Sequence, residues 1–166
     1  VSVQLPRRSS PRIHDFCKWI GCGMALIALG FSTVFIIRFY RADIYFEYGR
    51  RILEYERANL PAITEKGLFF MKRAILLNPY ESFYRDELCR TYIQMAFKTK
   101  DETWLQKAYV EADTALKLIP QHYMGFFHLG MIYQFLAEQI GRNTTNQALD
   151  CYKKAIDSDP FQAPFH

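Results

Sequence analysis

Cysteine is scarce in this sequence and follows no recognised disulfide or metal-binding pattern. The 166 residues contain four cysteines, none in a Cys-x-x-Cys pair, and there is no His-Glu-x-x-His motif. Cys17 and Cys22 lie at or within a long apolar run, and no disulfide pairing can be deduced. His122 and His128 stand six residues apart, on different sides of a helix. We therefore expect no metal site and expect both histidines to be structural or surface residues.

Motifs that carry enzyme chemistry are also missing. The sequence has no Gly-x-Ser-x-Gly elbow, no phosphate-binding Gly-x-x-x-x-Gly-Lys-Ser/Thr loop and no dinucleotide-binding Gly-x-Gly-x-x-Gly motif. The carboxylates are scattered, so no acid and base pair can be singled out. We expect no catalytic residue and no cofactor in this chain, which argues against an enzyme.

Excess charge is confined to the N-terminal part. The formal net charge is +4, and five basic residues against one acid before residue 39 account for all of it. The remainder holds 16 basic and 16 acidic residues. Nucleic-acid binding needs a basic face or stripe, so a balanced remainder argues against a DNA or RNA partner.

A long apolar run follows the basic N-terminal segment (residues 1–18). Trp19 to Ile37 contains no charged residue, and at about 1.5 Å per residue a helix of this length crosses roughly 30 Å of hydrocarbon. Lys18 and Arg38 bracket the run. We predict a single transmembrane helix over residues 19–38, which binds the chain to a membrane.

A secretory signal peptide is the alternative to an anchor, but its apolar core is usually only 7 to 15 residues long. Retention as an anchor is favoured because the run here is longer and continues into Ile-Ile-Arg-Phe-Tyr-Arg. Basic residues flank both ends, so their counts do not decide the orientation. Those on the N-terminal side are barely offset by acids, which favours a cytoplasmic N-terminus and an extracytoplasmic remainder.

Residues 39–166 contain an internal repeat. Three copies of one short sequence motif end at Pro79, Pro120 and Pro160, and these prolines are 41 and 40 residues apart. A second marker keeps the same period, because small residues recur upstream at Gly49, Cys89 and Gly130. Periods in this range are typical of stacked helical hairpins.

The copies resemble the tetratricopeptide repeat (TPR) family. The third copy matches the family pattern best, with Leu129, Gly130 and Tyr133 in its first helix and Ala155 and Pro160 at the end of its second. The resemblance implies an all-α fold, one transmembrane helix followed by an α-solenoid of about three TPR-like hairpins. The repeats fall at approximately 42–79, 82–120 and 123–160.

Each copy exceeds the family period of about 34 residues by six or seven. The excess lies between the two helices of each copy, at 56–64, 98–106 and 139–147. We interpret these stretches as enlarged loops; slightly overlong hairpins with solvated tips are the alternative, and a binding role for the loops is a third possibility.

In TPR proteins the concave surface is lined mainly by the first helix of each repeat. Arg50 and Arg90 occupy equivalent positions in this chain, and an arginine there can hold a carboxylate of a protein or peptide partner. The alternative is that they pair with acids of their own stack, such as Asp86. By register, the predicted groove consists of Asp43, Phe46, Arg50, Phe83, Asp86, Arg90, Met124, Phe127 and Met131.

A looser resemblance covers residues from about 19 to the end. An apolar span that leads through Phe39-Tyr-Arg-Ala-Asp-Ile-Tyr-Phe-Glu-Tyr-Gly into overlong repeats ending in Leu-Asn-Pro is similar to the C-terminal tail of bacterial O-antigen ligase and polymerase relatives. Those proteins have further membrane helices and transfer lipid-linked glycan. The chain would then be a regulatory or docking tail, and a fragment, since it opens with Val and carries none of the family's catalytic loop.

Two functions therefore stay open: a membrane-anchored scaffold for protein partners, and the tail of such a membrane enzyme. The last copy also lacks a polar cap, so we expect the apolar side of Ala148, Tyr152 and Ala155 to be exposed. A partner, a second copy of the chain or further sequence would then cover it.

Overall fold

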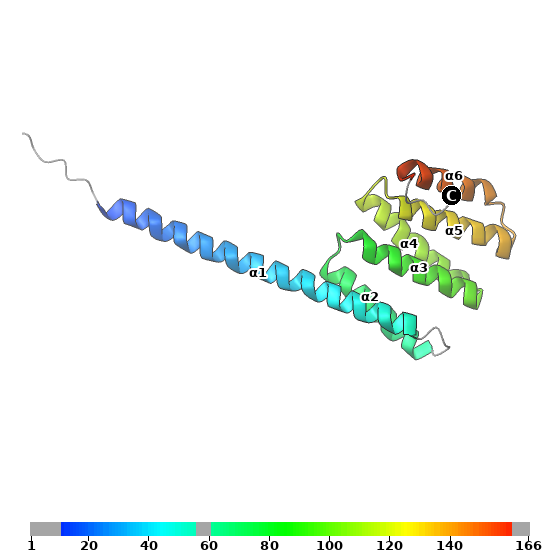
Figure 1. Cartoon of the computed structure of the whole chain (residues 1–166), viewed down its shortest axis with the longest axis horizontal. Helices are drawn as coiled ribbons and strands as arrows, with labels where there is room; N and C mark the ends of the chain where they lie inside the picture. Colours follow the sequence, from blue (N-terminus) through cyan, green and yellow to red (C-terminus); the bar gives the residue numbers. More distant parts are fainter. Residues whose placement is uncertain (1–10, 56–60, 161–166) are drawn as a thin grey trace, which may run out of the picture. The chain divides into compact units, whose positions relative to one another are not determined.

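The computed structural model describes residues 11–55 and 61–160, and all regular structure in these ranges is α-helical (Figure 1). This confirms the all-α prediction. The helices are α1 (Pro11–Tyr55), α2 (Pro61–Leu77), α3 (Ser82–Thr99), α4 (Glu102–Leu118), α5 (Tyr123–Ile140) and α6 (Thr145–Ser158). The chain forms two compact units, Val1–Tyr40 and Arg41–His166.

The first unit contains the apolar run. The segment Lys18–Glu54 of α1 is long and apolar enough to cross a membrane, with a mean hydropathy of 2.3 in its most apolar window. Large side chains such as Trp19 and Leu26 are 78% and 69% exposed, so no protein core covers them within the described part of the chain. The hydroxyl of Ser32 donates to the carbonyl of Ala28 at 2.9 Å. This bond satisfies the hydroxyl within the helix itself.

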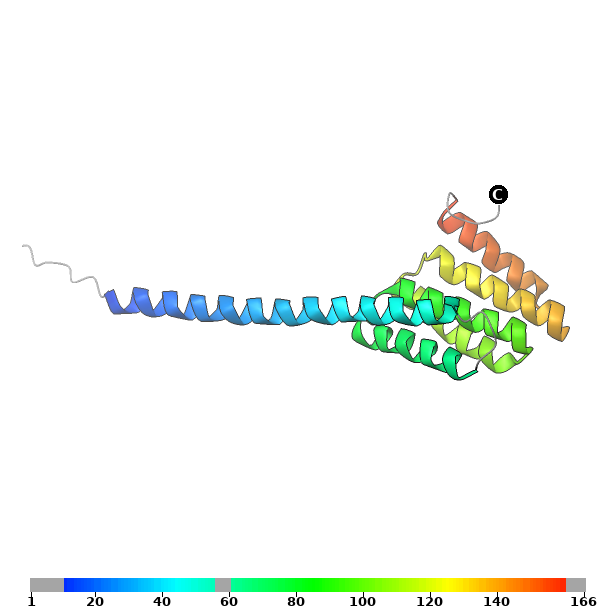
Figure 2. The same cartoon turned by 60° about the horizontal axis from the view of Figure 1, so that its bottom comes forward.

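The second unit consists of antiparallel helix pairs (Figure 2). α3 packs on α4 and α5 packs on α6, while α3 also contacts both α2 and α5. The part of α1 that belongs to this unit packs on α2 through the rings of Tyr45 and Tyr48, which lie 5.9 and 4.8 Å from the ring of Phe70. The core includes Phe46, Met71, Ala74, Leu88, Cys89, Tyr92, Ile93, Ala112, Ile132 and Phe135.

Small residues lie where the helices of each pair approach most closely. A Cβ atom added at Gly49 would meet the backbone oxygen of Gly67 in α2 at 2.8 Å. In the next copy Cys89 is fully buried, and its thiol donates to the carbonyl of Ala108 in α4 at 3.2 Å. Gly130 faces the ring of Tyr152 in α6. The repeat-marking positions are therefore the contact points between paired helices.

The second helix of each pair also presents small residues. Ala74, Ala115 and Ala155 are all fully buried, as their place in the repeat predicts. Ala148 and Ala155 pack into the interior beside α5, so the expectation that they form an exposed terminal face was wrong. The exposed apolar residues of α6 are instead Leu149 and Ile156, at 52% and 37%.

The stretches predicted as enlarged loops at 98–106 and 139–147 are mostly helical, and the connections are only residues 100–101 and 141–144, as the alternative of slightly overlong hairpins expects. α3 continues to Thr99 and α4 begins at Glu102, while α5 continues to Ile140 and α6 begins at Thr145. The extra residues lengthen the helices, which have 18 residues in both α3 and α5. Helix is favoured because each added residue gains a backbone hydrogen bond. In the first copy α2 begins at Pro61, and residues 56–60 lie outside the described ranges.

Local capping explains the tight turn between α3 and α4. Lys100 takes a left-handed conformation (φ 59°), and its N–H donates to the carbonyl of Ala96 at 2.8 Å. The carboxylate of Asp101 then accepts from the N–H of Thr103 at 2.9 Å, which starts α4. Hydrogen bonds from the backbone N–H and the hydroxyl of Thr103 lower the pKa of Asp101. Two residues therefore suffice to reverse the chain.

The Gly49→Ala substitution should destabilise the second unit. The new methyl group would press on backbone atoms of α2, which cannot rotate away as a side chain can. We expect a loss of about 1–3 kcal/mol, as for other overpacked sites, measured by denaturant unfolding of the full chain in detergent micelles. Gly23→Ala is the matched control, because a Cβ atom there meets no atom within 4 Å. Equal stability of the two variants would contradict the close approach of α1 and α2.

Candidate functional site

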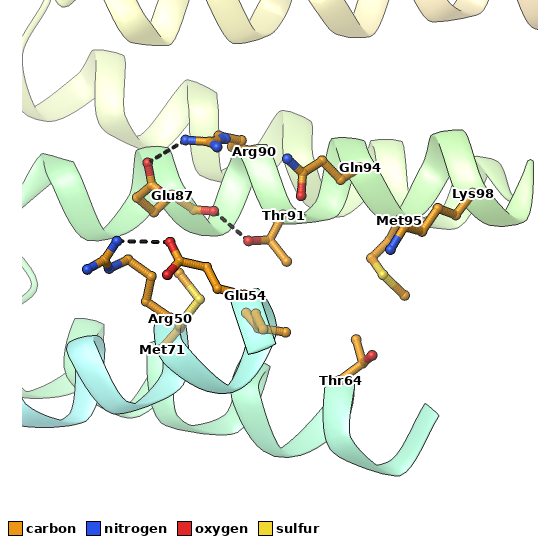
Figure 3. Close-up of a pocket in the computed structure, with 11 residues that line it drawn as sticks. Arg50, Glu54, Thr64, Met71, Glu87, Arg90, Thr91, Gln94, Met95 and Lys98 are labelled. Atoms are coloured by element: carbon orange, nitrogen blue, oxygen red, sulfur yellow. Dashed lines mark hydrogen bonds and ion pairs between the residues drawn. The ribbon is translucent and has the colours of Figure 1, made fainter. Parts of the chain in front are cut away.

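A polar pocket lies between α1, α2 and α3 of the second unit (Figure 3). Its cavity volume is about 90 Å³, room for a carboxylate group rather than for a drug-sized ligand, which needs several hundred Å³. The lining residues are Arg50, Leu53, Glu54, Thr64, Met71, Glu87, Arg90, Thr91, Gln94, Met95 and Lys98. The structure thus brings the two predicted groove arginines into one pocket.

Arg50 is held by two acids of its own helix. Its guanidinium donates to Glu47, one helical turn before it, at 3.0 Å and to Glu54, one turn after it, at 2.9 Å. All three side chains are between 38% and 55% exposed. Ion pairs at this exposure contribute at most about 1 kcal/mol each, so an incoming carboxylate can replace one of them.

Arg90 occupies the equivalent position on α3. Its guanidinium contacts Glu87, again one turn before it, at 3.3 Å, and its side chain is 52% exposed. Both arginines therefore pair with acids of their own helices, as the alternative interpretation expects, although the acids are not Asp86. Thr91 donates its hydroxyl to the backbone carbonyl of Glu87 at 2.8 Å, so this group is engaged within α3.

Charged side chains of both signs surround the pocket. Among the lining residues, Arg50, Arg90 and Lys98 are basic and Glu54 and Glu87 are acidic, and Glu47, which does not line the pocket, also pairs with Arg50. Guanidinium groups form bidentate hydrogen bonds with carboxylates. The two guanidinium groups are therefore available to hydrogen-bond an acidic group.

The sequence analysis missed most of this pocket. Glu87, Thr91, Gln94 and Lys98 recur at spacings of three and four residues, which places them on one face of α3 together with Arg90. A stripe of polar residues along a helix that otherwise contributes to the core could have indicated this pocket. The repeat pattern of the family singles out only the position after each small residue, so it predicts Arg50 and Arg90 but not the rest of the stripe.

Other predicted groove residues surround a second, shallower hollow. Asp43, Phe46, Arg50 and Phe83 line it with Glu47, Glu81 and Tyr84. The carboxylate of Asp43 accepts a hydrogen bond from the hydroxyl of Tyr84. Burial raises the pKa of Tyr84, and this hydrogen bond raises it further. Phe46 is only 5% exposed, because its ring stacks on Tyr84 at 4.6 Å. Its ring is therefore a core group, whereas Phe83 remains 53% exposed.

Asp86 is buried rather than on a groove wall, with 4% exposure. Its carboxylate is 2.6 Å from the Nε2 atom of His122, and its other oxygen is 4.0 Å from the Nδ1 atom of His128. The contact with His122 joins α3 to the start of α5, whereas the 4.0 Å separation from His128 is too long for a hydrogen bond. His122 precedes α5 as its N-terminal cap residue, with extended backbone angles. The spacing argument that separated the two histidines therefore failed, because it assumed that both lie within a helix.

The remaining predicted groove residues lie on α5 and do not line the arginine pocket. Met124, Phe127 and Met131 are all half-buried. The ring of Phe127 packs 5.9 Å from that of Tyr152 in α6, and Met131 packs against the main core. Within the described ranges, no group of three or more histidine, cysteine or acidic side chains is arranged to hold a metal ion.

No protein-family model matches this chain, and no curated protein matches it. The resemblance to TPR proteins therefore rests on the repeats themselves and stays a prediction. The looser resemblance to the tail of O-antigen ligase relatives, with the bacterial membrane enzyme that it implies, also stays a prediction.

The buried histidine predicts a pH dependence of stability. Burial lowers the pKa of His128 to about 4 from an ordinary value of 6.5. Among the nearby charges, Asp86 raises this pKa, whereas His122 and Arg90 lower it. The unfolded chain thus binds a proton at higher pH than the folded chain does. The stabilisation that this difference provides is complete above pH 6.5 and is lost as the pH falls towards 4.

The expected loss is at most about 3 kcal/mol over this interval, since each pKa unit corresponds to about 1.4 kcal/mol. Denaturant unfolding of the full chain at pH 7, 6, 5 and 4 measures it. The His128→Gln variant is less stable at pH 7 but carries no titrating group at this position, so its stability should fall less steeply. Parallel pH profiles of the two proteins would contradict this assignment.

Proposed function

We propose that this chain is a membrane-anchored TPR-type scaffold with no catalytic site of its own, which binds an acidic segment of a protein partner. One observation carries the proposal. Arg50 and Arg90 stand at equivalent positions of successive repeats, and both line the same pocket. A pair of guanidinium groups supplied by adjacent repeats is suited to recognise a carboxylate.

The energetics support exchange of the present ion pairs for a partner. Glu47, Glu54 and Glu87 hold the arginines in place, and the exposed pairs are individually weak. An acidic side chain that enters the small cavity is shielded from water on several sides, which strengthens its hydrogen bonds to the guanidinium groups. Leu53, Met71 and Met95 supply apolar contacts to the stem of that side chain.

The anchor in this proposal is the transmembrane helix over residues 19–38. The basic N-terminal segment lies in the cytoplasm, and the second unit faces the extracytoplasmic side. Tethering confines the binding site to the membrane surface, so it meets membrane-bound partners at a raised effective concentration.

Charge reversal of both arginines should abolish binding without unfolding the second unit. Fluorescein-labelled peptides rich in Asp and Glu, together with their Asn and Gln counterparts, serve as probes for the full chain in nanodiscs. Fluorescence anisotropy should detect binding of the acidic peptides, weakened at least tenfold by Arg50→Glu with Arg90→Glu. This corresponds to the loss of one or two charge-assisted hydrogen bonds.

The matched control is Arg51→Glu with Arg142→Glu. These arginines also form exposed ion pairs, with Glu47 at 2.9 Å and Glu102 at 2.8 Å, but neither lines the pocket. The control should bind as the unmodified chain does. Equal weakening by both double variants would mean that general charge, rather than the pocket, attracts the peptides, and unchanged binding by both would refute the site.

The proposed orientation predicts the behaviour of reporter fusions. In a bacterial expression host, alkaline phosphatase joined to the C-terminus should be active, because it requires export. Green fluorescent protein at the same position should be dark when exported through the unfolded-chain pathway. The opposite pair of results would place the second unit in the cytoplasm.

A further inference from the structure

Three large apolar side chains are exposed around the turn between α2 and α3. Leu76 is 66% exposed, Tyr80 79% and Phe83 53%. For comparison, Trp19 in the apolar run of α1 is 78% exposed. Exposed apolar side chains that gather on one part of a surface are typical of protein-binding or membrane-contact sites.

Contacts within the second unit fix where this turn lies. The hydroxyl of Tyr84 donates to Asp43, and the ring of Phe83 lies 5.4 Å from that of Phe46. The start of α3 therefore packs beside the first turn of the second unit. Asp43 follows Arg38, the last residue of the predicted span, by five residues. The exposed group thus belongs to the end of the unit at which the chain enters it.

The distances agree with the depth of a membrane interface. Five residues of helix rise roughly 7.5 Å. The polar headgroup layer on each side of the hydrocarbon core is roughly 5–8 Å thick. Because only five residues join Asp43 to Arg38, the start of α3, which contacts Asp43 through Tyr84, stays within reach of that layer. Aromatic residues, tyrosine above all, are favoured there because their rings contact acyl chains while a hydroxyl reaches water.

We propose that Leu76, Tyr80 and Phe83 contact the headgroup boundary of the phospholipid bilayer into which residues 19–38 insert. This inference rests on the proposed membrane anchoring. The contact needs no separate affinity of its own, since the tether keeps the surface beside the bilayer. It also leaves the arginine pocket open, because Arg50 lies seven residues, or about 10 Å, further along α1 than Asp43.

Quenching of tryptophan fluorescence by lipid-borne bromine tests the proposal on the full chain. The chain has two tryptophans, Trp19 and Trp104. Three single-tryptophan proteins are compared: Trp19 alone (Trp104→Phe), Trp104 alone (Trp19→Phe), and Tyr80→Trp with both natural tryptophans changed to Phe. Each is reconstituted into phosphatidylcholine vesicles with or without bromine at carbons 6 and 7 of one acyl chain.

Trp104 is the internal control. It lies in the first turn of α4, and the far end of that helix leads into the turn at His122, which contacts Asp86 near the start of α3. The 17 residues of α4 therefore place Trp104 about 20 Å or more from the proposed contact. We expect strong quenching of Trp19, at least half as much quenching of the tryptophan at position 80, and little quenching of Trp104.

The possible failures are distinguishable. Quenching of Trp19 without quenching at position 80 would overturn the lipid contact and leave the anchoring intact. Absence of quenching at Trp19 would overturn the anchoring itself, and the lipid contact with it. A second copy of the chain could cover the surface instead. The tryptophan at position 80 should then emit at short wavelength without quenching by bromine, and its emission should shift to longer wavelength when added lipid dilutes the protein. This result also overturns the proposal.

Discussion

Close approach of paired helix backbones is the constraint on which the second unit depends. At the first pair, two glycines face each other and leave no room for a methyl group, because Gly49 lies against the backbone oxygen of Gly67. The second pair meets the same requirement with Cys89 and Ala108. Here the thiol of Cys89 donates a hydrogen bond to the backbone carbonyl of Ala108. In the third pair Gly130 accommodates the ring of Tyr152. The same contact is thus made by three different side-chain combinations.

This variety explains how much of the fold the sequence could reveal. The helix-pair pattern was predictable because proline and small residues recur at fixed spacing. Gly67 was missed although it lies 41 residues before Ala108, because the family pattern expects alanine there. Helix ends were misplaced for a different reason. Charged residues such as Lys98 and Glu102 are compatible with both loops and exposed helix, and only local capping by Lys100 and Asp101 decides between them.

The candidate site was predictable only in part, for a similar physical reason. Repeat register correctly aligned Arg50 with Arg90, since both follow a small residue that fixes the rotation of the helix. Register says nothing about what the next repeat places over a given position. Asp86 was assigned to an open surface, but the segment that begins α5 brings His122 over it. A buried carboxylate needs such a partner, and His122 comes from 36 residues further along the chain.

Charged side chains have two different environments in this unit. Between α3 and the start of α5, the buried carboxylate of Asp86 lies 2.6 Å from the Nε2 atom of His122 and is enclosed by the core. Around Arg50 and Arg90 the ion pairs are partly exposed, and each is formed with an acid of the same helix. The proposed acidic partner would then compete for the arginines without changing the buried contact between Asp86 and His122. Under this proposal, binding and folding depend on separate sets of charges.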